Sequence, residues 1–255
     1  MKESLKINHP IDSFFSPDLM PSVWCPGCGI GTVVYTFIQA IEEAKIDVNK
    51  ICVVSGNGCV GKVAKYMNFK SYSITNDSII NYAEYLKSRN PDKKVFVFSN
   101  NPDFLLSDSK DFMEVGKRNT EMVVIHINNC IYNINEKGFF PISPFMKSSA
   151  DKKFDLPFNI PYLAELSGAV YVARWTPLRA GWLKYSIMDA ISKKGFSVIE
   201  VISPCVIYFT TDRRIGDAVE QMKFYSEYFI MKQDESVKNL DIRNQKIIIG
   251  KFVDR

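Results

Sequence analysis

Short apolar runs alternate with amphipathic segments along most of this chain. The runs are rich in Val, Ile and Phe, and each ends at a turn that contains glycine or polar residues. Runs of this length and composition are typical of strands that are buried on both faces of a parallel sheet. The pattern predicts core strands at residues 51–54, 95–98, 122–127, 171–175 and 196–202.

Between these runs, apolar residues recur at the spacing of a helix that packs on one face. The clearest case is residues 31–45, where Val33, Val34, Phe37, Ile38 and Ile41 share one side. Further helices are expected at residues 81–89, at 112–117, from 162 onward, and at 183–192 with Gly195 as the stop signal. Strands that alternate with helices predict an α/β fold with a mostly parallel sheet flanked by helices.

The two ends of the chain differ from this pattern. Residues 1–23 are polar and interrupted by prolines, which predicts an extended arm that wraps a partner. Residues 210–255 are expected to form a C-terminal extension that packs on the domain or on a partner. Residues 1–255 as a whole are predicted to form a single α/β domain, because a chain of this length fills one core of ordinary size.

Composition narrows the classes of function. Hydrophobic residues make up 46% of the chain and charged residues 24%, which is the profile of a soluble globular protein. The net charge of +4 is small and dispersed, which argues against nucleic acid as a partner. No apolar run approaches the length of a membrane span, and the N-terminus lacks the apolar core of a secretory signal. Reduced cysteines favour the cytoplasm.

Four of the six cysteines carry most of the chemical information. Cys25, Cys28, Cys59 and Cys205 each lie in a segment rich in Gly or Pro, where backbone N–H groups can turn inward. Four thiolates with N–H donors around them are what an iron–sulfur cluster requires. The remaining two cysteines are interpreted as buried small hydrophobic residues.

Two other uses of these cysteines remain open on residue chemistry alone. A four-cysteine zinc site uses the same atoms, although its second pair usually also comes as C-x-x-C, whereas here it is split between Cys59 and Cys205. A thioredoxin-type redox pair has the spacing of Cys25 and Cys28. The preceding residues 13–18, however, do not have the pattern of a core strand.

Three local motifs carry a resemblance to a known family. Residues 24–29 read Trp-Cys-Pro-Gly-Cys-Gly, residues 55–61 read Ser-Gly-Asn-Gly-Cys-Val-Gly, and residues 203–206 read Ser-Pro-Cys-Val. Together with the closing segment 246–252, they resemble the β subunit of the 2-oxoacid:ferredoxin oxidoreductases over nearly the whole chain. The resemblance implies that Cys25, Cys28, Cys59 and Cys205 hold a [4Fe–4S] cluster, and that the subunit holds thiamine diphosphate with Mg²⁺.

The same resemblance implies an activity and partners. The family carries out the coenzyme A-dependent oxidative decarboxylation of a 2-oxoacid, which yields an acyl-CoA, CO₂ and reduced ferredoxin. Its β subunit pairs with an α-type subunit that covers the cofactor. The apolar segment 139–145 is expected to lie at such a subunit interface. No catalytic residue is assigned in this chain.

The thiamine and Mg²⁺ positions are implied by the resemblance as well. They fall at Gly58, Gly61, Asn101, Asp103, Asn129 and Ile131. The family motif Gly-Asp-Gly-Asp reads Asn-Asn-Pro-Asp at residues 100–103, so Asn101 replaces the first, Mg²⁺-binding Asp. An amide oxygen can ligate Mg²⁺ but brings no charge, and Pro102 removes a backbone donor. Asp103 is expected to cap a turn instead of replacing the lost ligand.

Two further loops depart from the family in ways that also disfavour an anionic cofactor. The family motif Asp-Asn-x-x-Tyr-Gly-Met-Thr-Gly-Gly-Gln matches residues 128–138, which retain Asn129 and Tyr132 but replace Gly-Gly by Glu136 and Lys137. A Leu-His-Gly-Arg motif is replaced by residues 75–78, where Asp77 adds a negative charge. Three loops that disfavour an anionic cofactor predict a retained cluster and a weak or absent thiamine role.

Three hypotheses follow from these motifs. The first is a β-like accessory subunit that relays electrons or gives structural support. The second is an ordinary catalytic β subunit whose pocket is adapted to an unusual substrate. The third is a scaffold subunit held together by zinc.

Overall fold

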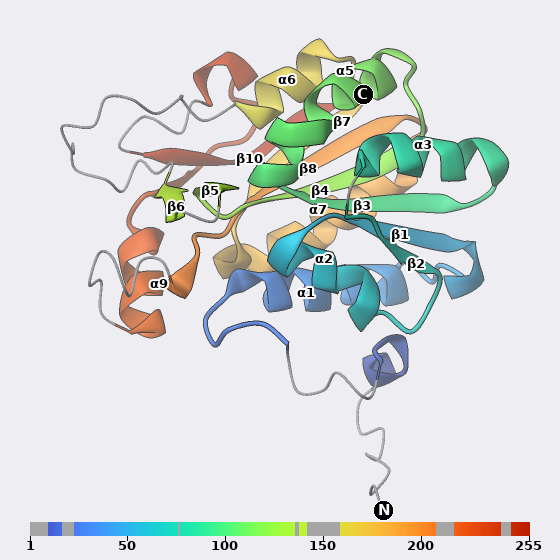
Figure 1. The fold of residues 1–255 in the computed structure, drawn as a ribbon. Coiled ribbons are helices and arrows are strands. Elements are labelled where there is room, and N and C mark those ends of the chain that lie inside the picture. The colour runs from blue at the N-terminus through green and yellow to red at the C-terminus, as the bar shows by residue number, and fades with distance from the viewer. Residues whose placement is uncertain are drawn as a thin grey trace, which may run out of the picture.

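An eight-stranded sheet in the order β2-β1-β3-β4-β8-β7-β10-β9 forms the centre of the molecule (Figure 1). The computed structural model describes residues 10–16, 23–75, 77–135, 138–141, 159–207, 217–240 and 246–255. The strands of the sheet are β1 (Ile51–Ser55), β2 (Ser71–Ser73), β3 (Lys94–Asn100), β4 (Met122–Asn128), β7 (Tyr171–Trp175), β8 (Phe196–Ile202), β9 (Phe229–Met231) and β10 (Ile247–Asp254). A separate antiparallel ribbon joins β5 (Ile131–Asn135) to β6 (Gly138–Pro141).

Neighbouring strands from β2 to β7 are all parallel, and β10 runs antiparallel to β7. The predicted mostly parallel α/β fold is therefore confirmed. All five predicted core strands are present, because each is an apolar run buried on both faces. Residues 247–254 form β10, a further strand between β7 and the edge strand β9 that the apolar pattern did not indicate.

Helices cover both faces of the sheet. The α-helices are α1 (Gly29–Glu43), α2 (Gly58–Tyr66), α3 (Ile79–Arg89), α4 (Asn101–Asp103), α5 (Ser109–Lys117), α6 (Ile160–Leu166), α7 (Ala180–Ser192) and α9 (Ala218–Ser226). Shorter turns are η1 (Pro10–Phe14), η3 (Val48–Lys50), η5 (Pro177–Arg179) and η6 (Val237–Asn239), and η4 (Phe104–Asp108) is a π-helical turn. In Figure 1, α1, α2 and α7 lie below the sheet, whereas α3, α5 and α6 lie above it.

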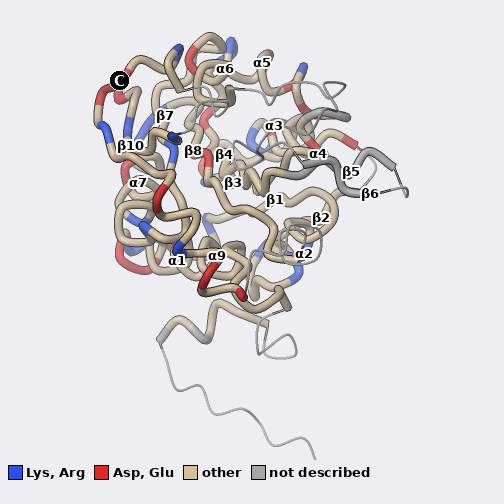
Figure 2. The backbone as a smooth tube through the Cα atoms, turned by 90° about the vertical axis from the view of Figure 1, so that its left-hand side faces the viewer, with Lys and Arg blue, Asp and Glu red and all other residues tan. Residues whose placement is uncertain are grey.

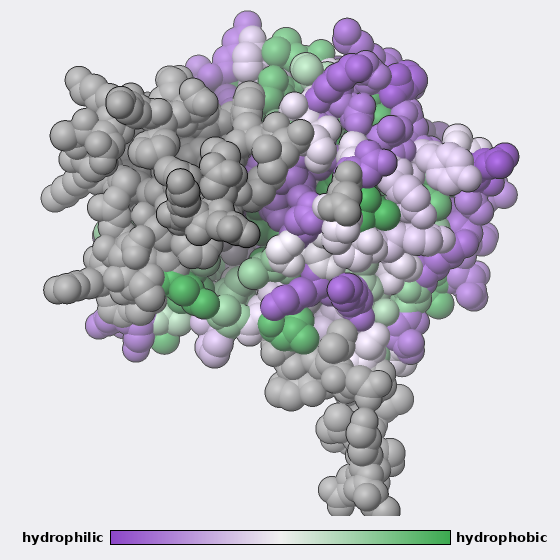
Figure 3. All heavy atoms as spheres, in the orientation of Figure 1, coloured by the Kyte–Doolittle hydropathy of each residue, from purple (hydrophilic) through white to green (hydrophobic). Residues whose placement is uncertain are grey.

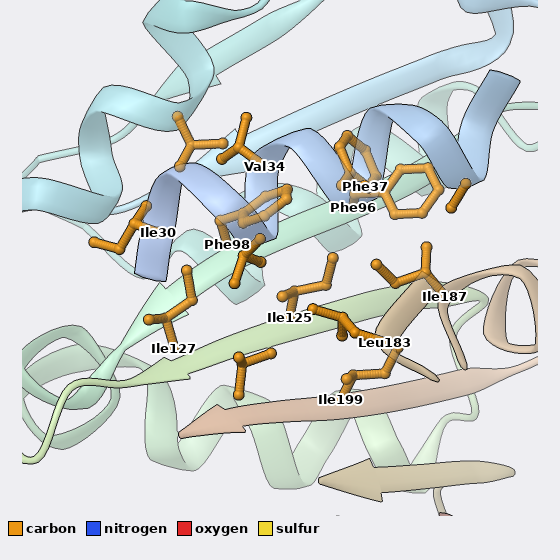
Figure 4. Packing of buried hydrophobic residues seen from close by; sticks show 14 of the residues in the cluster. Ile30, Val34, Phe37, Phe96, Phe98, Ile125, Ile127, Leu183, Ile187 and Ile199 are labelled. Atoms are coloured by element: carbon orange, nitrogen blue, oxygen red, sulfur yellow. The ribbon is translucent and has the colours of Figure 1, made fainter. Parts of the chain in front are cut away.

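The apolar face of α1 packs on the core at one face of the sheet. Phe37 of α1 packs edge-on against Phe96 and Phe98 of β3, with ring centroids 4.8 and 5.2 Å apart. Figure 4 shows these rings above Ile125 of β4, with Leu183 of α7 alongside. A second cluster on the other face contains apolar residues of β3, β4 and β8 together with those of α3, α5 and α6. The sheet is therefore covered on both sides, as parallel sheets usually are.

Helix α7 ends at Ser192, as predicted, and begins three residues earlier than predicted. Gly195 is not its stop signal but lies in the turn before β8, where Asn119 would meet any side chain. Within the predicted arm, residues 10–16 pack on their own chain. Ile11 and Phe15 are buried there, and the isolated bridge of Phe15 to Met67 joins this segment to the end of α2. Residues 1–9 and 17–22 of the arm lie outside the described residues.

The surface carries charges of both signs. Figure 2 shows basic and acidic positions interspersed around the molecule. On the face seen in Figure 3, the part formed by α3 is predominantly hydrophilic. None of the described helices is long and apolar enough to cross a membrane.

Candidate functional site

The carboxyl ends of four neighbouring strands bring the predicted site residues to one edge of the sheet. Strands β1, β3, β4 and β8 are adjacent and parallel. Cys59 follows β1, Asn101 follows β3, Asn129 follows β4, and Cys205 follows β8. Ligand sites of open α/β sheets lie at this edge.

The Cys25–Cys28 segment is a tight turn that leads directly into α1. The Cys28 N–H donates to the Cys25 carbonyl at 2.9 Å, and Gly27 has a φ of +80°. Pro26 at the second position and a positive φ at the third are the features of a type II turn. Cys28 is the N-cap of α1, so its sulfur lies at the positive end of a helix dipole.

Cys59 lies in the first turn of α2, which the sequence analysis interpreted as a glycine-rich loop. That interpretation is wrong because Val60, Val63 and Ala64 give α2 an apolar face that is buried. The indole N–H of Trp24 donates to the Cys59 carbonyl at 2.8 Å. This bond ties the turn that holds Cys25 to the start of α2.

Cys205 is anchored by the loop that follows β4. Its N–H donates to the Asn129 carbonyl at 3.1 Å, and the Ser203 N–H donates to the Asn128 carbonyl at 2.9 Å. The retained family residue Asn129 therefore lies directly beside the fourth cysteine.

The other three cysteines contribute to the pKa of the Cys28 thiol. Burial is the main cause that raises this pKa, the Ile30 N–H lowers it, and the charges of Cys59, Cys205 and Cys25 raise it, which together give a pKa of about 11. Cys59 is exposed and the other three are half-buried. Within the described part of the chain, no three His, Cys, Asp or Glu side chains come close enough to hold a single metal ion.

Asp103 closes the loop after β1 through its carboxylate. Its carboxylate accepts bonds from the backbone N–H of Asn57 at 3.0 Å and from the Asn57 side chain at 2.9 Å. The carboxylate also occupies the space that a side chain at Gly56 would need. Burial raises the pKa of Asp103, while the two bonds from Asn57 lower it.

The glycines implied for cofactor binding have structural reasons to be glycine. Gly61 packs against the Gly56 carbonyl, where a side chain would collide with the backbone. Gly58 has a φ of +64°, a conformation that other residues adopt only with strain. Ile131 begins β5, whereas Glu136, Lys137 and residues 142–145 lie outside the described residues. Asp77 is exposed and its carboxylate accepts a bond from the Ser78 N–H at 2.8 Å.

A buried ion pair underlies this edge of the sheet. Arg174 of β7 and Glu200 of β8 are register partners, and both side chains are 0% exposed. The Arg174 Nε–H donates to Glu200 Oε2 at 2.6 Å, and Arg174 Nη1–H donates to the Leu240 carbonyl at 2.7 Å. Asn128 Nδ2 donates to the other Glu200 oxygen at 2.8 Å.

The ion pair fixes the orientation of the Asn128, Asn101 and His126 side chains, which are bonded to it in series. A carboxylate only accepts, so Asn128 must turn its Nδ2 to Glu200 and its Oδ1 to Asn101. Asn101 Nδ2 donates to that Oδ1 at 2.8 Å, which leaves Asn101 Oδ1 to accept from His126 Nε2 at 2.9 Å. His126 Nδ1 then accepts from the Ser99 hydroxyl at 2.8 Å.

His126 is therefore a neutral ring that is bonded at both nitrogens. Burial lowers the pKa of His126 to about 4. Both polar atoms of the Asn101 amide are engaged inside the protein, one with His126 and one with Asn128. Neither is presented to a ligand.

Asn128, Arg174 and Glu200 were not predicted as members of this network. A signal was available, because oppositely charged residues inside two apolar strands need a partner when those strands are buried. Which strand lies beside which was not readable from the local pattern.

Asp108 is a second buried acid near this edge. It is 0% exposed and its Oδ1 accepts from the Ile79 N–H at 3.0 Å. Its Oδ2 has no hydrogen-bond partner among the described residues. Burial raises the pKa of Asp108 to about 7, and the charge of Asp103 adds to this effect.

Comparison with known proteins identifies the family. Residues 56–201 match the model of the thiamine pyrophosphate enzyme, C-terminal TPP binding domain. The 2-oxoglutarate synthase subunit KorB of Methanothermobacter marburgensis is 33% identical over 96% of this chain and 87% of its own length. This chain belongs to the family of β subunits of 2-oxoacid:ferredoxin oxidoreductases.

Other members of the family give the same result. KorB of Methanocaldococcus jannaschii is 34% identical over 96% of this chain and 92% of its own length. The 2-oxoacid:ferredoxin oxidoreductase subunit beta of a Sulfolobus species is 34% identical over 72% of this chain and 62% of its own length. A solved structure of 2-oxoglutarate:ferredoxin oxidoreductase from Magnetococcus marinus superposes on this chain with a TM-score of 0.79 at 20% sequence identity. The superposition covers 98% of this chain and 86% of the solved chain, which shows a shared fold.

The raised pKa of Asp108 makes a prediction about stability. Between pH 3.8, where the unfolded carboxyl ionises, and about 7, the unfolded state loses a proton that the folded state keeps, so stability falls as pH rises. Asp108→Asn mimics the protonated acid. We expect the difference in free energy of unfolding between this variant and wild type to rise by at most about 4 kcal/mol from pH 4 to pH 7. Above pH 7 the difference should stay constant.

Urea unfolding at pH 5 and pH 8 measures this difference. Asp92→Asn removes an exposed carboxyl group and serves as the matched control. A variant Asp108→Asn that is destabilised equally at both pH values would contradict the raised pKa.

Proposed function

We propose that this chain is the iron–sulfur β-type subunit of a 2-oxoacid:ferredoxin oxidoreductase complex, in which Cys25, Cys28, Cys59 and Cys205 hold one [4Fe–4S] cluster. The observation that carries this proposal is the convergence of the four thiols. They come from three segments far apart in the sequence, yet the other three all act on the charge of Cys28. The role of the subunit is then electron relay or structural support within the complex.

The donor set fits a cluster better than a single ion. A zinc ion bound at about 2.3 Å to each sulfur would bring its ligands within about 4 Å of one another, and the cysteines are not gathered that closely. A four-iron cluster is wider than one ion and takes four cysteine thiolates. The N-termini of α1 and α2 would stabilise the thiolates of Cys28 and Cys59.

The exposure of the cysteines suggests a direction for electron transfer. Cys59 is exposed, so a soluble electron carrier can approach the site on its side. When bound, the cluster would supply one-electron transfer, and ferredoxin is the carrier that fits the family. A cytoplasmic location agrees with reduced cysteines.

The residues at the Mg²⁺ positions do not fit a thiamine diphosphate site in this arrangement. The Asn101 amide is used by His126 and Asn128, and the Asp103 carboxylate is used by Asn57. A diphosphate requires a divalent cation, and a missing carboxylate removes on the order of 4 kcal/mol of attraction at about 4 Å. We infer that this chain retains the fold of the thiamine domain while its thiamine role is degraded. The match to the TPP binding domain favours the alternative of an ordinary catalytic β subunit with a divergent pocket.

The cluster assignment predicts a metal content. An anaerobic, iron-replete preparation should carry about four irons and four sulfides per chain, as a cysteine-ligated [4Fe–4S] cluster requires. Cys205→Ala should lose the cluster because a ligand is removed. Cys52→Ala, which changes a buried cysteine of β1, is the matched control and should retain it. Stoichiometric zinc without iron would instead support the zinc-held scaffold.

The degraded thiamine site predicts a negative binding experiment. Calorimetry with thiamine diphosphate and Mg²⁺, on a preparation free of other β-type chains, should show no stoichiometric binding. Asn101→Asp with Pro102→Gly should not restore it, because the new carboxylate faces Asn128 Oδ1 and that amide is fixed by Glu200. The double variant should also unfold at a lower temperature than wild type. Micromolar binding by the wild-type chain would establish the ordinary catalytic β subunit.

Exposed apolar side chains on η5, α7 and α9 predict a protein partner. Leu178, Trp182 and Tyr185 on η5 and α7 are 38%, 51% and 55% exposed, and Met222 of α9 is 37% exposed. Leu178 and Met222 also line a cavity of about 240 Å³ next to Gly27. Apolar surface of this kind marks interaction sites, and we propose an α-type subunit as the partner.

Coexpression with the α-type subunit tests this surface. Trp182→Glu should reduce co-purification at least tenfold, since buried aromatic residues dominate interface energies. Tyr85→Glu changes a residue that is 53% exposed on α3 and should leave co-purification intact. A separately expressed chain that sediments as a well-behaved monomer, together with unaffected pairing of Trp182→Glu, would contradict the prediction.

A further inference from the structure

The Arg174–Glu200 pair is a costly feature that the fold alone does not require. Both side chains are 0% exposed in the middle of the sheet. Burying two charges costs more than a hydrophobic pair of similar size in many proteins, so such a pair is weak evidence for a role in stability. Its bonds lead instead toward the loop that carries Cys205.

Asn128 connects the ion pair to that loop. Its side chain donates to Glu200, and its Oδ1 accepts from both Asn101 Nδ2 and the Cys130 N–H, the latter at 3.1 Å. Its own carbonyl accepts the Ser203 N–H, and the next carbonyl accepts the Cys205 N–H. The position of Cys205 therefore depends on the geometry of residues 128 and 129.

Cys130 shows that this geometry is held against strain. Its φ is +58°, a left-handed conformation that strains a non-glycine residue. The Asn128 Oδ1 holds the Cys130 N–H in place. Because Oδ1 faces Cys130 only while Nδ2 faces Glu200, the carboxylate determines whether this turn is closed.

We propose that the Arg174–Glu200 ion pair, acting through the Asn128 amide, positions Cys205 as a ligand at the four-cysteine site. Glu200, Arg174 and Asn128 are positioning residues in this account, since none of them is itself a ligand. The role of Cys205 as a cluster ligand rests on the proposed function. The effect of the ion pair on the position of Cys205 does not depend on a cluster.

Glu200→Gln is the informative change because it preserves shape. Gln must turn its carbonyl to the Arg174 guanidinium, which always donates, and so presents its NH₂ to Asn128. The Asn128 amide must then reverse, and the Cys130 N–H loses its acceptor. Removing Arg174 as well, in Arg174→Met with Glu200→Gln, frees the Gln carbonyl to accept from Asn128 and should restore the wild-type orientation.

The first measurement uses the full-length chain without a cluster. Cysteine alkylation is followed by mass spectrometry, with the exposed Cys59 as an internal reference. Glu200→Gln should raise the labelling rate of Cys205 relative to Cys59 several-fold, and the double variant should return it to the wild-type ratio. Glu121→Gln removes a carboxylate from the ion pair with Lys94 at the opposite edge of the sheet and is the matched control.

The second measurement uses the cluster-loaded protein. Changes to residues that orient metal ligands typically cost 10- to 100-fold in affinity. We expect Glu200→Gln to lose iron to a chelator about tenfold faster than wild type and to change the electron paramagnetic resonance signal of the reduced cluster. Glu121→Gln should leave both unchanged, and far-ultraviolet circular dichroism establishes that each variant is folded.

The two measurements separate the two proposals. A wild-type chain that takes up no iron and sulfide overturns the cluster assignment, while the alkylation ratio still tests the positioning role. A wild-type chain that holds the cluster, with Glu200→Gln indistinguishable from Glu121→Gln in labelling, iron loss and spectrum, overturns the positioning role alone. Should Glu200→Gln not fold, Asn128→Asp makes the same test, because its second carboxylate oxygen faces Glu200 and repels it.

Discussion

The Glu200 carboxylate determines the polar order of the whole carboxyl edge. A carboxylate can only accept, and one of its oxygens is taken by Arg174, so the other fixes the Asn128 amide. That amide fixes Asn101, which in turn fixes the tautomer of His126. A reversal at any point would set two donors or two acceptors against each other in a site closed to water, where an unmatched polar group costs several times more than at the surface.

The parts of this structure that depend on local pattern were predictable from the sequence. The core strands follow from apolar runs, and α1 follows from the helical spacing of Val33, Phe37 and Ile41. The helix α2 was not predicted, because three glycines in residues 56–61 indicate a turn by propensity. Burial of its apolar face outweighs that propensity, which is at most about 1 kcal/mol per glycine.

The parts that depend on strand order could not be predicted. Asn128 and Glu200 are 72 residues apart, and Arg174 and Glu200 are 26 apart, yet they meet because β4, β8 and β7 are neighbours. Nothing in a single strand reveals which strand lies beside it. A site at the cysteines was easier to propose because their motifs are local, although the segments that carry them lie far apart in the sequence. Asp103 was expected to cap a turn of its own loop, but its carboxylate accepts from Asn57, which lies 46 residues away and which the local pattern does not place beside it.

The altered thiamine motifs are mutually consistent within this network. By resemblance, the positions of Asn101 and Asn128 carry aspartates in the family, and here they are two amides that bond to each other. An Asp at either position would bring a carboxylate against an acceptor or against Glu200. With amides at both, the hydrogen-bonded network from Arg174 to His126 contains one ion pair and otherwise neutral groups, so this network needs no divalent cation to balance its charge. The four cysteines differ in this respect, because burial and the charges of the other three raise the pKa of Cys28 and so disfavour its thiolate. The two halves of the same sheet edge thus differ in charge balance: the amide network balances its own charges, whereas the thiolates of the proposed cluster site would need a cationic group beside them.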